Sequence, residues 1–564
     1  MRHPDKILAI WVDAVCINQT DMHEKELQIQ LMRDIYSGAE EVIVWLGYRW
    51  DVRAPSEQPK IYDFDGDHRG VTQESEATEN NEGVEAMKGE KLYDDEDVVP
   101  GFAFFVMGAL NMHAYDMPIF KADGDEVMAV HSATMKKIMF SLSSFCNATW
   151  WTRLWTYQEI ILASKATILY HNVTISWDCV AGALNNIFQH DRTCCYRILN
   201  KAHPEFSGTF NELMSKWHSI EFERQRGFHG IHDYPPFTDL LTRTKWRQAT
   251  NPLDKVYGLL GLLSAEDAPE MRPDYTLEPR QAFMSAAIHD LKVSQGLWSL
   301  MGIPRTDVPG LPTWVTENSS SKKRYEDQCN RITAVARSFR ASGPTKTTFT
   351  VTGEVLALAG FSSFDRVRHL SPVIYERETS RQALGQTEKE HQSLSFPTLP
   401  DSCGPSDYAP NDERIYRGEQ TVGDALFRTF ANDIVHVGET YTRLEDSTVQ
   451  VAKEVWEMGT SQLSADDSNK WGMFLASSTK PSALRRLFFT EDSRMGIGPP
   501  SMATGDEIVL FCGGCAPFCV RKEPDWTERR PIYTLVGDVY LHGVMDGEAV
   551  PENWEEKLID IHLR

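Results

Sequence analysis

The sequence is short of positive charge. Its 57 Lys and Arg residues stand against 81 Asp and Glu residues, which gives a formal net charge of −24 with histidine neutral. Nucleic acids and anionic lipids are both bound through clustered Lys and Arg. The charge balance therefore argues against a nucleic-acid surface and leaves other proteins and small molecules as the expected partners.

Long apolar runs are also missing. The longest, GFAFFVMGAL at 101–110, is far shorter than the roughly 20 residues that a transmembrane helix needs. The first residues, MRHPDKILAIWVDAV, do not resemble a signal peptide, because Asp13 interrupts the apolar stretch. We expect a cytoplasmic protein without a membrane span.

Recognisable metal and nucleophile motifs are absent. The tightest cysteine cluster, Cys512, Cys515 and Cys519 in CGGCAPFC, has no matched second pair, so a Gly-rich turn between strands is expected there and no metal site. The polar turn HGVMDGE at 542–548 is another weak metal candidate that fits a solvated turn equally well. The sequence contains no G-x-S-x-G, H-E-x-x-H or Walker-type motif and no internal repeat.

The 564 residues, 41% of them hydrophobic, suffice for two to four domains. We expect a first domain at 1–180, a mostly helical region at 181–320, and a mixed α/β to β-rich region at 321–564. Two segments lack the composition of a core. Residues 51–100 hold fifteen Asp or Glu and five Lys or Arg, which predicts a disordered acidic insertion at about 50–100. A polar loop is expected at about 391–419.

The N-terminal segment has the pattern of a β-α-β unit. The apolar run Ile7–Val12 predicts a strand buried on both faces. A helix follows over 22–39, with Asp21 and Glu24 suited to its start and one apolar face made of Leu27, Leu31, Met32, Ile35 and Ala39. The short run EEVIVWLG at 40–47 predicts a second strand.

The polar residues after the first predicted strand are candidate ligand contacts. Ligands of open parallel sheets bind beyond the carboxyl ends of the strands, where Asp13, Asn18 and Gln19 are expected to lie. The alternative interpretation is structural, because the same side chains can bond loop amides and cap the helix. The sequence leaves both open.

A second cluster of candidates lies in WWTRLWTYQE at 150–159. Trp155 and Glu159 are four residues apart and share a helix face, with Arg153 close before them. An aromatic ring, a carboxylate and a guanidinium can together hold a nucleotide, but three tryptophans in six residues also indicate core packing. Downstream, ATILY and VTISW predict a pair of strands around His171 and Asn172.

The first segment closely resembles the core motif of the fungal heterokaryon-incompatibility (HET) domain. The positions that carry the resemblance are Asp13, Cys16, Ile17, Asn18, Gln19, Glu24, Gln28, Met32, Tyr36, Ala39, Trp45, Leu46 and Gly47. WWTRLWTYQEIILAS resembles the second block of that domain. NPLDKVYGLLGLL, PDYTLEP, LPTWV and the C-terminal TGDEIVLFCGGCAPFCVRK with YTLVGDVYLHGVMDGEAV are similar to segments usually found downstream in such proteins.

The resemblance implies a fold and a function. HET domains are distantly similar to Toll/interleukin-receptor (TIR) domains, which implies an α/β domain with a TIR-like open parallel sheet flanked by helices. The helical middle region and a β-rich C-terminal segment would follow it. HET domains usually begin with a strand of the Tyr-x-Ala-Leu-Ser-Tyr-x-Trp-Gly type, which does not occur before Ile7, so we expect the domain to be truncated at its N-terminus.

The implied function is self/non-self recognition with programmed cell death, acting through self-association of the HET domain. The TIR likeness implies an enzymatic alternative. In plant-type TIR domains the Glu of Trp-Cys-x-x-Glu-Leu cleaves NAD, and here Trp155 and Glu159 have the same spacing. Glu159 would then be the catalytic carboxylate, and Asp13, Asn18, Arg153 and Trp155 would line the nucleotide pocket. NAD would be a substrate, and no cofactor is expected. A degenerate, inactive protein is a third alternative.

Overall fold

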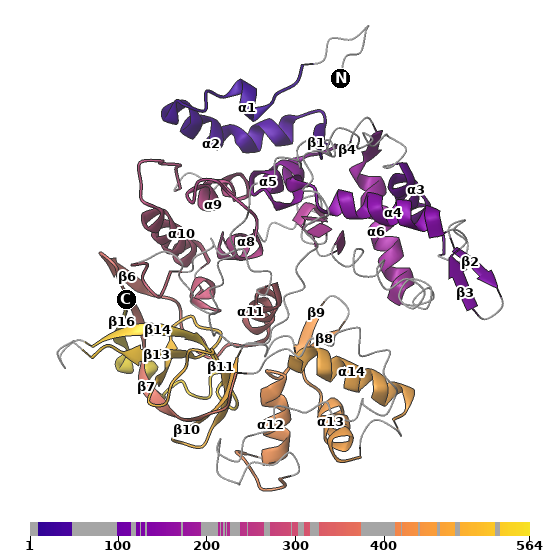
Figure 1. Cartoon of the computed structure of the whole chain (residues 1–564). Helices are drawn as coiled ribbons and strands as arrows, with labels where there is room; N and C mark the ends of the chain where they lie inside the picture. The colour runs from indigo at the N-terminus through magenta and orange to yellow at the C-terminus, as the bar shows by residue number, and fades with distance from the viewer. Residues whose placement is uncertain are drawn as a thin grey trace, which may run out of the picture. The chain divides into compact units, whose positions relative to one another are not determined.

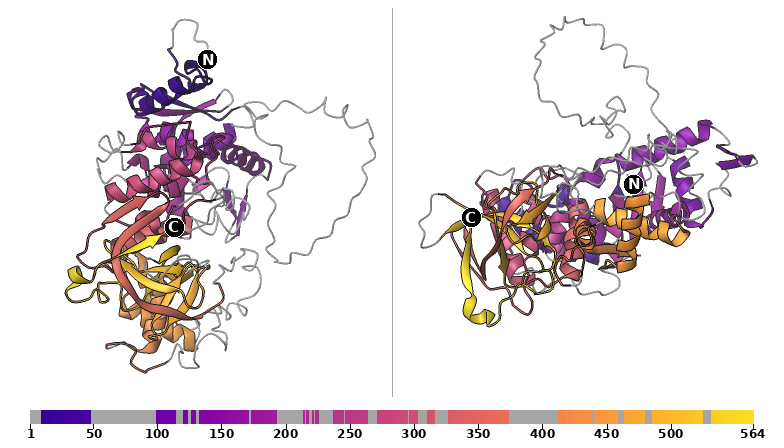
Figure 2. Two further views of the ribbon diagram at one scale, coloured as in Figure 1. Left: turned by 90° about the vertical axis from the view of Figure 1, so that its left-hand side faces the viewer. Right: turned by 90° about the horizontal axis from the view of Figure 1, so that it is seen from below.

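The computed structural model divides the chain into two compact units, which are described separately (Figures 1 and 2). One unit comprises 1–27, 233–246 and 250–564, and the other comprises 28–232 and 247–249. The structure describes residues 9–47, 99–113, 120–123, 126–129, 132–170, 173–192, 213, 214, 216, 217, 220, 221, 223–225, 237–244, 246–263, 271–294, 296–302, 310–315, 326–373, 412–418, 420–437, 440–458, 463–479, 485–524 and 531–564. The predicted acidic insertion and most of the predicted polar loop lie outside these residues.

The N-terminal segment contains the predicted helix but not the predicted first strand. Residues 9–12 pair with no described strand. The Val12 carbonyl accepts from Cys16 N (2.7 Å) at the start of the short helix α1 (Asp13–Cys16). The prediction of a buried strand at Ile7–Val12 is thus wrong for its described part, where Ile10 is 53% exposed. Helix α2 (Met22–Gly38) and strand β1 (Val42–Trp45) form as predicted.

Helix α2 buries only part of the predicted face. Its buried residues are Ile29 and Met32, whereas Leu27 and Leu31 remain 49% and 46% exposed. The helical periodicity is correct, but the choice of face depends on what covers it. The sequence offered more apolar positions than the neighbouring elements bury.

The second unit contains a three-stranded sheet with the order β1-β4-β5, where β4 is Ala166–Tyr170 and β5 is Val173–Ser176. β1 and β4 are parallel, but β4 and β5 are antiparallel. The two-residue link between β4 and β5 permits only an antiparallel hairpin. Among the described residues the expected open parallel sheet is therefore reduced to one parallel pair.

Among its described residues the same unit contains five further helices, of which α5 and α6 contact the sheet. They are α3 (Val99–Ala109), α4 (Ser132–Cys146), η4 (Thr149–Thr152), α5 (Trp155–Leu162) and α6 (Trp177–Arg192), and a separate hairpin is formed by β2 (Phe120–Asp123) and β3 (Glu126–Ala129). α3 packs on α4 and α6, with the Asn186 amide donating to the Gly108 carbonyl at 3.1 Å. Trp151, with no exposed surface, lies against Phe145, Trp150 and Trp177 in an aromatic core.

The described middle residues of the first unit are helical. Their elements are α8 (Phe237–Thr244), α9 (Asp254–Tyr257), η6 (Leu260–Leu262), α10 (Pro279–Ser294), η8 (Trp298–Leu300) and α11 (Glu326–Ser338). The described helices include none that is long and apolar enough to cross a membrane.

A closed β-barrel forms the C-terminal part of the same unit. Five strands close the ring in the order β12-β13-β14-β16-β7 and back to β12. The long strand β7 curves through the barrel and also pairs with β6 and β10, as Figure 1 shows. The strands are β6 (Phe349–Thr352), β7 (Val355–Leu370), β10 (Arg486–Thr490), β11 (Met495–Gly498), β12 (Glu507–Phe511), β13 (Phe518–Lys522), β14 (Ile532–Asp538), β15 (Tyr540–Leu541) and β16 (Ile559–Leu563), with η11 (Trp554–Lys557) before the last.

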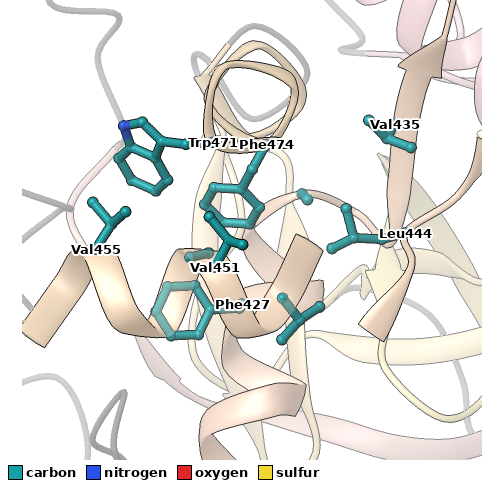
Figure 3. Packing of buried hydrophobic residues seen from close by; sticks show 10 residues of the cluster. Phe427, Val435, Leu444, Val451, Val455, Trp471 and Phe474 are labelled. Carbon is teal, nitrogen blue, oxygen red and sulfur yellow. The ribbon is translucent and has the colours of Figure 1, made fainter. Parts of the chain in front are cut away.

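A helical module is inserted between β7 and β10. It consists of α12 (Val422–Phe430), β8 (Ile434–Val437), β9 (Thr440–Arg443), α13 (Asp446–Met458) and α14 (Ala465–Thr479). Figure 3 shows its own hydrophobic core, in which Phe427, Val451 and Phe474 pack together and Trp471 stacks on Phe474. Thr421 begins α12 with a capping box: its hydroxyl accepts from Asp424 N, and the Asp424 carboxylate accepts from Thr421 N.

Candidate functional site

The polar loop after α1 satisfies its hydrogen bonds locally. Asp13 Oδ1 accepts from Ala14 N (2.7 Å), and Asn18 Oδ1 accepts from Thr20 N (3.2 Å) and the Thr20 hydroxyl (2.8 Å). Gln19 Nε2 donates to the Asp13 carbonyl (3.1 Å). Of the two interpretations that the sequence left open, this geometry supports the structural one.

The start of α2 follows from the same polar residues. Asp21 Oδ1 accepts from His23 N (3.0 Å) and Glu24 N (3.1 Å), as an N-cap does. Glu24 Oε1 in turn accepts from Asn18 N (3.0 Å) and so ties the loop to the helix. Asn18 is exposed and Asp13 is half-buried, so both remain accessible.

The second candidate cluster divides into a core part and an accessible part. Trp150 and Trp151 are buried, so core packing explains two of the three tryptophans. Trp155, the first residue of α5, and Glu159, one turn later, are both half-buried, and Arg153 before the helix is exposed. The second unit thus presents an aromatic ring, a carboxylate and a guanidinium at the start of one helix.

The buried side chain of Arg247 contacts the residues at the start of α5. Arg247 Nη1 donates to the Arg153 carbonyl (3.1 Å), and its guanidinium lies 4.7 Å from the centre of the Tyr157 ring. Burial lowers the pKa of Arg247 to about 10, so it stays protonated at neutral pH. The neighbouring Gln158 is buried, and neither its amide nitrogen nor its amide oxygen has a hydrogen-bond partner. The sequence analysis identified neither residue as part of the site, although Gln158 lies within the block WWTRLWTYQE.

The five predicted site residues fall into two groups. Asp13 and Asn18 belong to the first unit, while Arg153, Trp155 and Glu159 belong to the second. Within the second unit, the candidates for a nucleotide pocket are therefore Arg153, Trp155 and Glu159.

The first unit contains a polar cluster that the sequence analysis missed. The Tyr275 hydroxyl donates to Asp254 Oδ1 (2.5 Å), its ring lies 4.1 Å from Lys25 Nζ, and its backbone N–H donates to Glu26 Oε1 (2.8 Å). Burial and the adjacent carboxylate raise the pKa of Tyr275, so the phenol stays protonated. The cluster joins α2 to the segments NPLDKVYG and PDYTLEP. Both segments resemble blocks of the family, and this resemblance could have marked Asp254 and Tyr275 as candidates. Its contacts are those of a structural junction.

The structure places both metal candidates of the sequence analysis. Cys512, Cys515 and Cys519 lie in the β12–β13 hairpin, whose connection is the predicted Gly-rich turn with Gly513 at a positive φ of 77°. His542 accepts or donates at both ring nitrogens, to the Tyr540 hydroxyl (2.8 Å) and to Gln420 Oε1 (2.7 Å). Within the described residues no group of three or more His, Cys, Asp or Glu side chains is placed to bind a metal ion.

Two family models match the chain. Residues 1–159 match the family described as Heterokaryon incompatibility protein (HET), and residues 414–559 match the Het-6 beta-barrel domain. The second match includes the helical module and the strands from β10 to β15, whereas β7, which closes the ring, precedes it.

The chain is also similar to a curated fungal protein. It is 25% identical over 612 aligned residues to "Heterokaryon incompatibility protein 6, OR allele" of Neurospora crassa, and the alignment covers 96% of this chain and 81% of the relative. No solved structure matches the chain. The sequence-based prediction of a HET-domain protein with a heterokaryon-incompatibility function is confirmed by these matches.

Proposed function

We propose that this heterokaryon-incompatibility protein acts in self/non-self recognition in the cytoplasm and triggers programmed cell death through its HET domain. One observation carries the proposal: HET and Het-6 barrel matches occur in a single chain whose similarity to a named incompatibility protein extends over 96% of its length. The HET region is then the effector, and the remainder of the chain controls it.

Self-association of the HET region is part of the proposal. Of the fifteen large apolar side chains exposed in the described residues, eight lie between residues 10 and 45. The first unit contributes Ile10, Val12, Val15, Met22 and Leu27, and the second unit contributes Leu31, Ile43 and Trp45. Exposed apolar side chains at this density are typical of surfaces that bind protein. The net charge of −24 argues against nucleic acid as the partner.

A fusion experiment tests the proposal. The full chain is expressed in one strain of Neurospora crassa that is then fused with a strain lacking it, and dye uptake by fused cells is scored. We expect dying fusion cells with the natural chain and few with a double variant, Ile43→Asp with Trp45→Asp. A matched control, Leu558→Asp with Ile559→Asp, changes exposed residues of the barrel region and should retain killing. Viable fusion cells despite full expression would contradict the proposal.

The enzymatic alternative rests on α5. Trp155 and Glu159 share one helix face and are accessible, with the exposed Arg153 beside them in the sequence, which supports a role for Glu159 in NAD cleavage. Its carboxylate would hold the nicotinamide-ribose hydroxyls and stabilise the positive charge that develops as the glycosidic bond breaks. Arg153 would pair with phosphate, and Trp155 would stack on a ring. Such an activity would agree with the proposed TIR likeness of the domain.

Nicotinamide release by the purified full chain tests this alternative. Glu159→Gln should lower the rate by about 10²-fold or more, because the substitution removes the charge that favours the transition state. Asp178→Asn changes an exposed acid at the start of α6 in the same unit and should leave the rate unchanged. Equal rates for Glu159→Gln and the natural chain would exclude Glu159 as the catalytic residue, and an absence of NAD cleavage would exclude the enzymatic function.

A further inference from the structure

Strand β1 lies at the end of its sheet. The sheet order β1-β4-β5 gives β1 one neighbour among the described strands, with Val42 paired to Ala166 and Trp45 paired to Leu169. The other edge of β1 therefore has no strand beside it in the part of the chain that the structure describes. An edge of this kind presents backbone N–H and C=O groups to any strand that approaches it.

The backbone groups of β1 alternate between its two edges. Val42 N donates to the Lys165 carbonyl (2.9 Å), so Val42 faces β4. Because successive residues of a strand bond to opposite sides, the N–H and C=O groups of Ile43 and Trp45 point to the other edge. The edge thus offers two residues that are placed symmetrically on either side of Val44.

The side chains of β1 alternate between its two faces. Val42 and Val44 are buried, and α5 contacts this strand. Ile43 and Trp45 point to the opposite face and are 40% and 54% exposed, although Trp45 has a further interaction within the chain. The strand is therefore packed on one face, while the other face retains accessible apolar surface.

The sequence of β1 lacks the features that usually protect an edge strand. Natural edges are blocked by Lys, Pro or a β-bulge, and Val42–Trp45 contains none of these. The charge just before the strand belongs to Glu41, which lies 3.3 Å from Lys165 Nζ and accepts from the Thr167 hydroxyl. This carboxylate is thus paired on the β4 side and does not guard the other edge.

A second copy of β1 matches this edge. In an antiparallel alignment centred on Val44, Ile43 of each copy lies opposite Trp45 of the other, so the edge-facing residues of both copies meet. Glu41 then lies opposite Gly47, which has no side chain. A parallel alignment in register would instead place Glu41 beside Glu41 of the second copy, where like charges repel. Charge and alternation therefore both favour the antiparallel pair.

We propose that β1 pairs antiparallel with β1 of a second copy, which joins the two sheets across a two-fold axis at Val44. The pairing presupposes the proposed self-association of the HET region and specifies the surface that it uses. Ile43 and Trp45 of the two copies exchange backbone hydrogen bonds, and each Ile43 side chain packs beside a Trp45 ring. Because both copies use the same edge, the contact closes on itself and produces a dimer.

A proline at the edge tests the pairing. The full chain is followed by size-exclusion chromatography with light scattering over a range of concentrations, and we expect the natural chain to form a dimer. Ile43→Pro removes one edge-facing N–H from each copy and leaves the bonds to β4 intact, so it should weaken dimerisation by about tenfold or more. The matched control Ile43→Thr keeps the N–H and a β-branched side chain, and its dimerisation should stay within about threefold of that of the natural chain.

The outcomes separate the pairing from self-association in general. Equal weakening by Ile43→Pro and Ile43→Thr would overturn the proposal, because the side chain and not the backbone edge would then make the contact. Dimerisation that Ile43→Pro leaves unchanged would also overturn it, while self-association would stand. A natural chain that remains monomeric at every concentration would contradict both.

Hydrogen exchange needs no variant and decides the question if Ile43→Pro does not fold. Peptides of the natural chain that cover residues 40–47 should exchange more slowly at concentrations where light scattering shows the dimer than where it shows the monomer. Peptides that cover β5, at the opposite end of the same sheet, should exchange equally at both concentrations. Unchanged exchange of residues 40–47 in the dimer would overturn the proposal.

Discussion

Residues 9–47 and the C-terminal barrel place similar residues in opposite environments. In the N-terminal segment large apolar side chains are exposed, up to 82% for Val15, while its carboxylates bond neighbouring loop amides. In the barrel region even charged side chains are buried, and Asp538 and Arg485 have no exposed surface. The difference lies in closure: the barrel strands return to their starting partner, whereas β1 pairs with β4 alone among the described strands.

This contrast suggests that the two regions depend on different interactions, the barrel on contacts within the chain and the N-terminal segment on contacts with another protein. A closed barrel needs no partner to cover its edges, so its stability is internal and its buried charges must be compensated inside. The N-terminal segment carries the family motif and exposes apolar side chains, which we propose bind another protein. We therefore expect substitutions to affect folding in the barrel and association in the N-terminal segment.

The largest effect is expected from Asp538→Asn. It removes the buried carboxylate that accepts from Arg331 Nη1 (2.6 Å) and Nη2 (2.9 Å) and lies 3.7 Å from Arg485 Nη2. The substitution should lower the free energy of unfolding by about 4 kcal/mol. Urea denaturation of the full chain measures this. The control Asp546→Asn changes a half-exposed partner of Arg443 and should cost less than about 1 kcal/mol. Equal effects would break the proposed contrast between buried and exposed charge.

A matched pair of leucines probes the apolar side of the comparison. Leu510→Ala, at a fully buried position in β12, should cost about 3 kcal/mol. Leu31→Ala, 46% exposed on α2, should cost less than about 1 kcal/mol. Thermal and urea unfolding compare them, with size-exclusion chromatography reporting association. A large loss of monomer stability from Leu31→Ala would mean that this face of α2 is covered within the chain.

The acid sensitivity of the barrel region provides a third test, whose effect reaches its full size only near pH 4. Burial, with Arg428 and Arg443 nearby, lowers the pKa of His542 to about 4, below its unfolded value of about 6.5. The neutral ring is thus favoured by folding, so its contribution is present above pH 6.5 and is lost as the pH falls towards 4, by up to about 3 kcal/mol. His542→Gln should flatten unfolding free energy between pH 6.5 and 4. An unchanged pH profile would show that other groups set the acid sensitivity.

Much of the local structure was predictable. The helix at 22–39 and the strand pair around His171 and Asn172 follow from periodicity and a short turn, and Asp21 caps α2 as its residue type suggests. The absence of the first predicted strand was not predictable. An apolar run can form a strand or lead into a helix, and whether it forms a strand depends on another strand pairing with it. The β7 partners β12 and β16 lie more than a hundred residues away along the chain, beyond the reach of local pattern.

The candidate site was predictable only in part. Trp155 and Glu159 were found because they stand four residues apart, as in the family motif, and Arg153 was found because its residue type stands two residues before Trp155. Arg247 and Tyr275 were not, because each acts on a distant segment through one side chain and no periodicity marks them. A buried arginine and an exposed one also look identical in a sequence, so the cluster of Arg331, Arg485 and Asp538 had no signal.

The sequence by itself determined the family resemblance, the helix caps and the short turns, because each depends on residues close together in the chain. It also determined the net charge of −24, which argues against a nucleic-acid surface. The tertiary structure alone decided which face of α2 is covered, that residues 9–12 are not a strand, and that β7 closes a barrel. It also decided that two arginines share one carboxylate. These outcomes depend on which distant surfaces meet, since burial and counter-charge are properties of the surroundings and not of the residue.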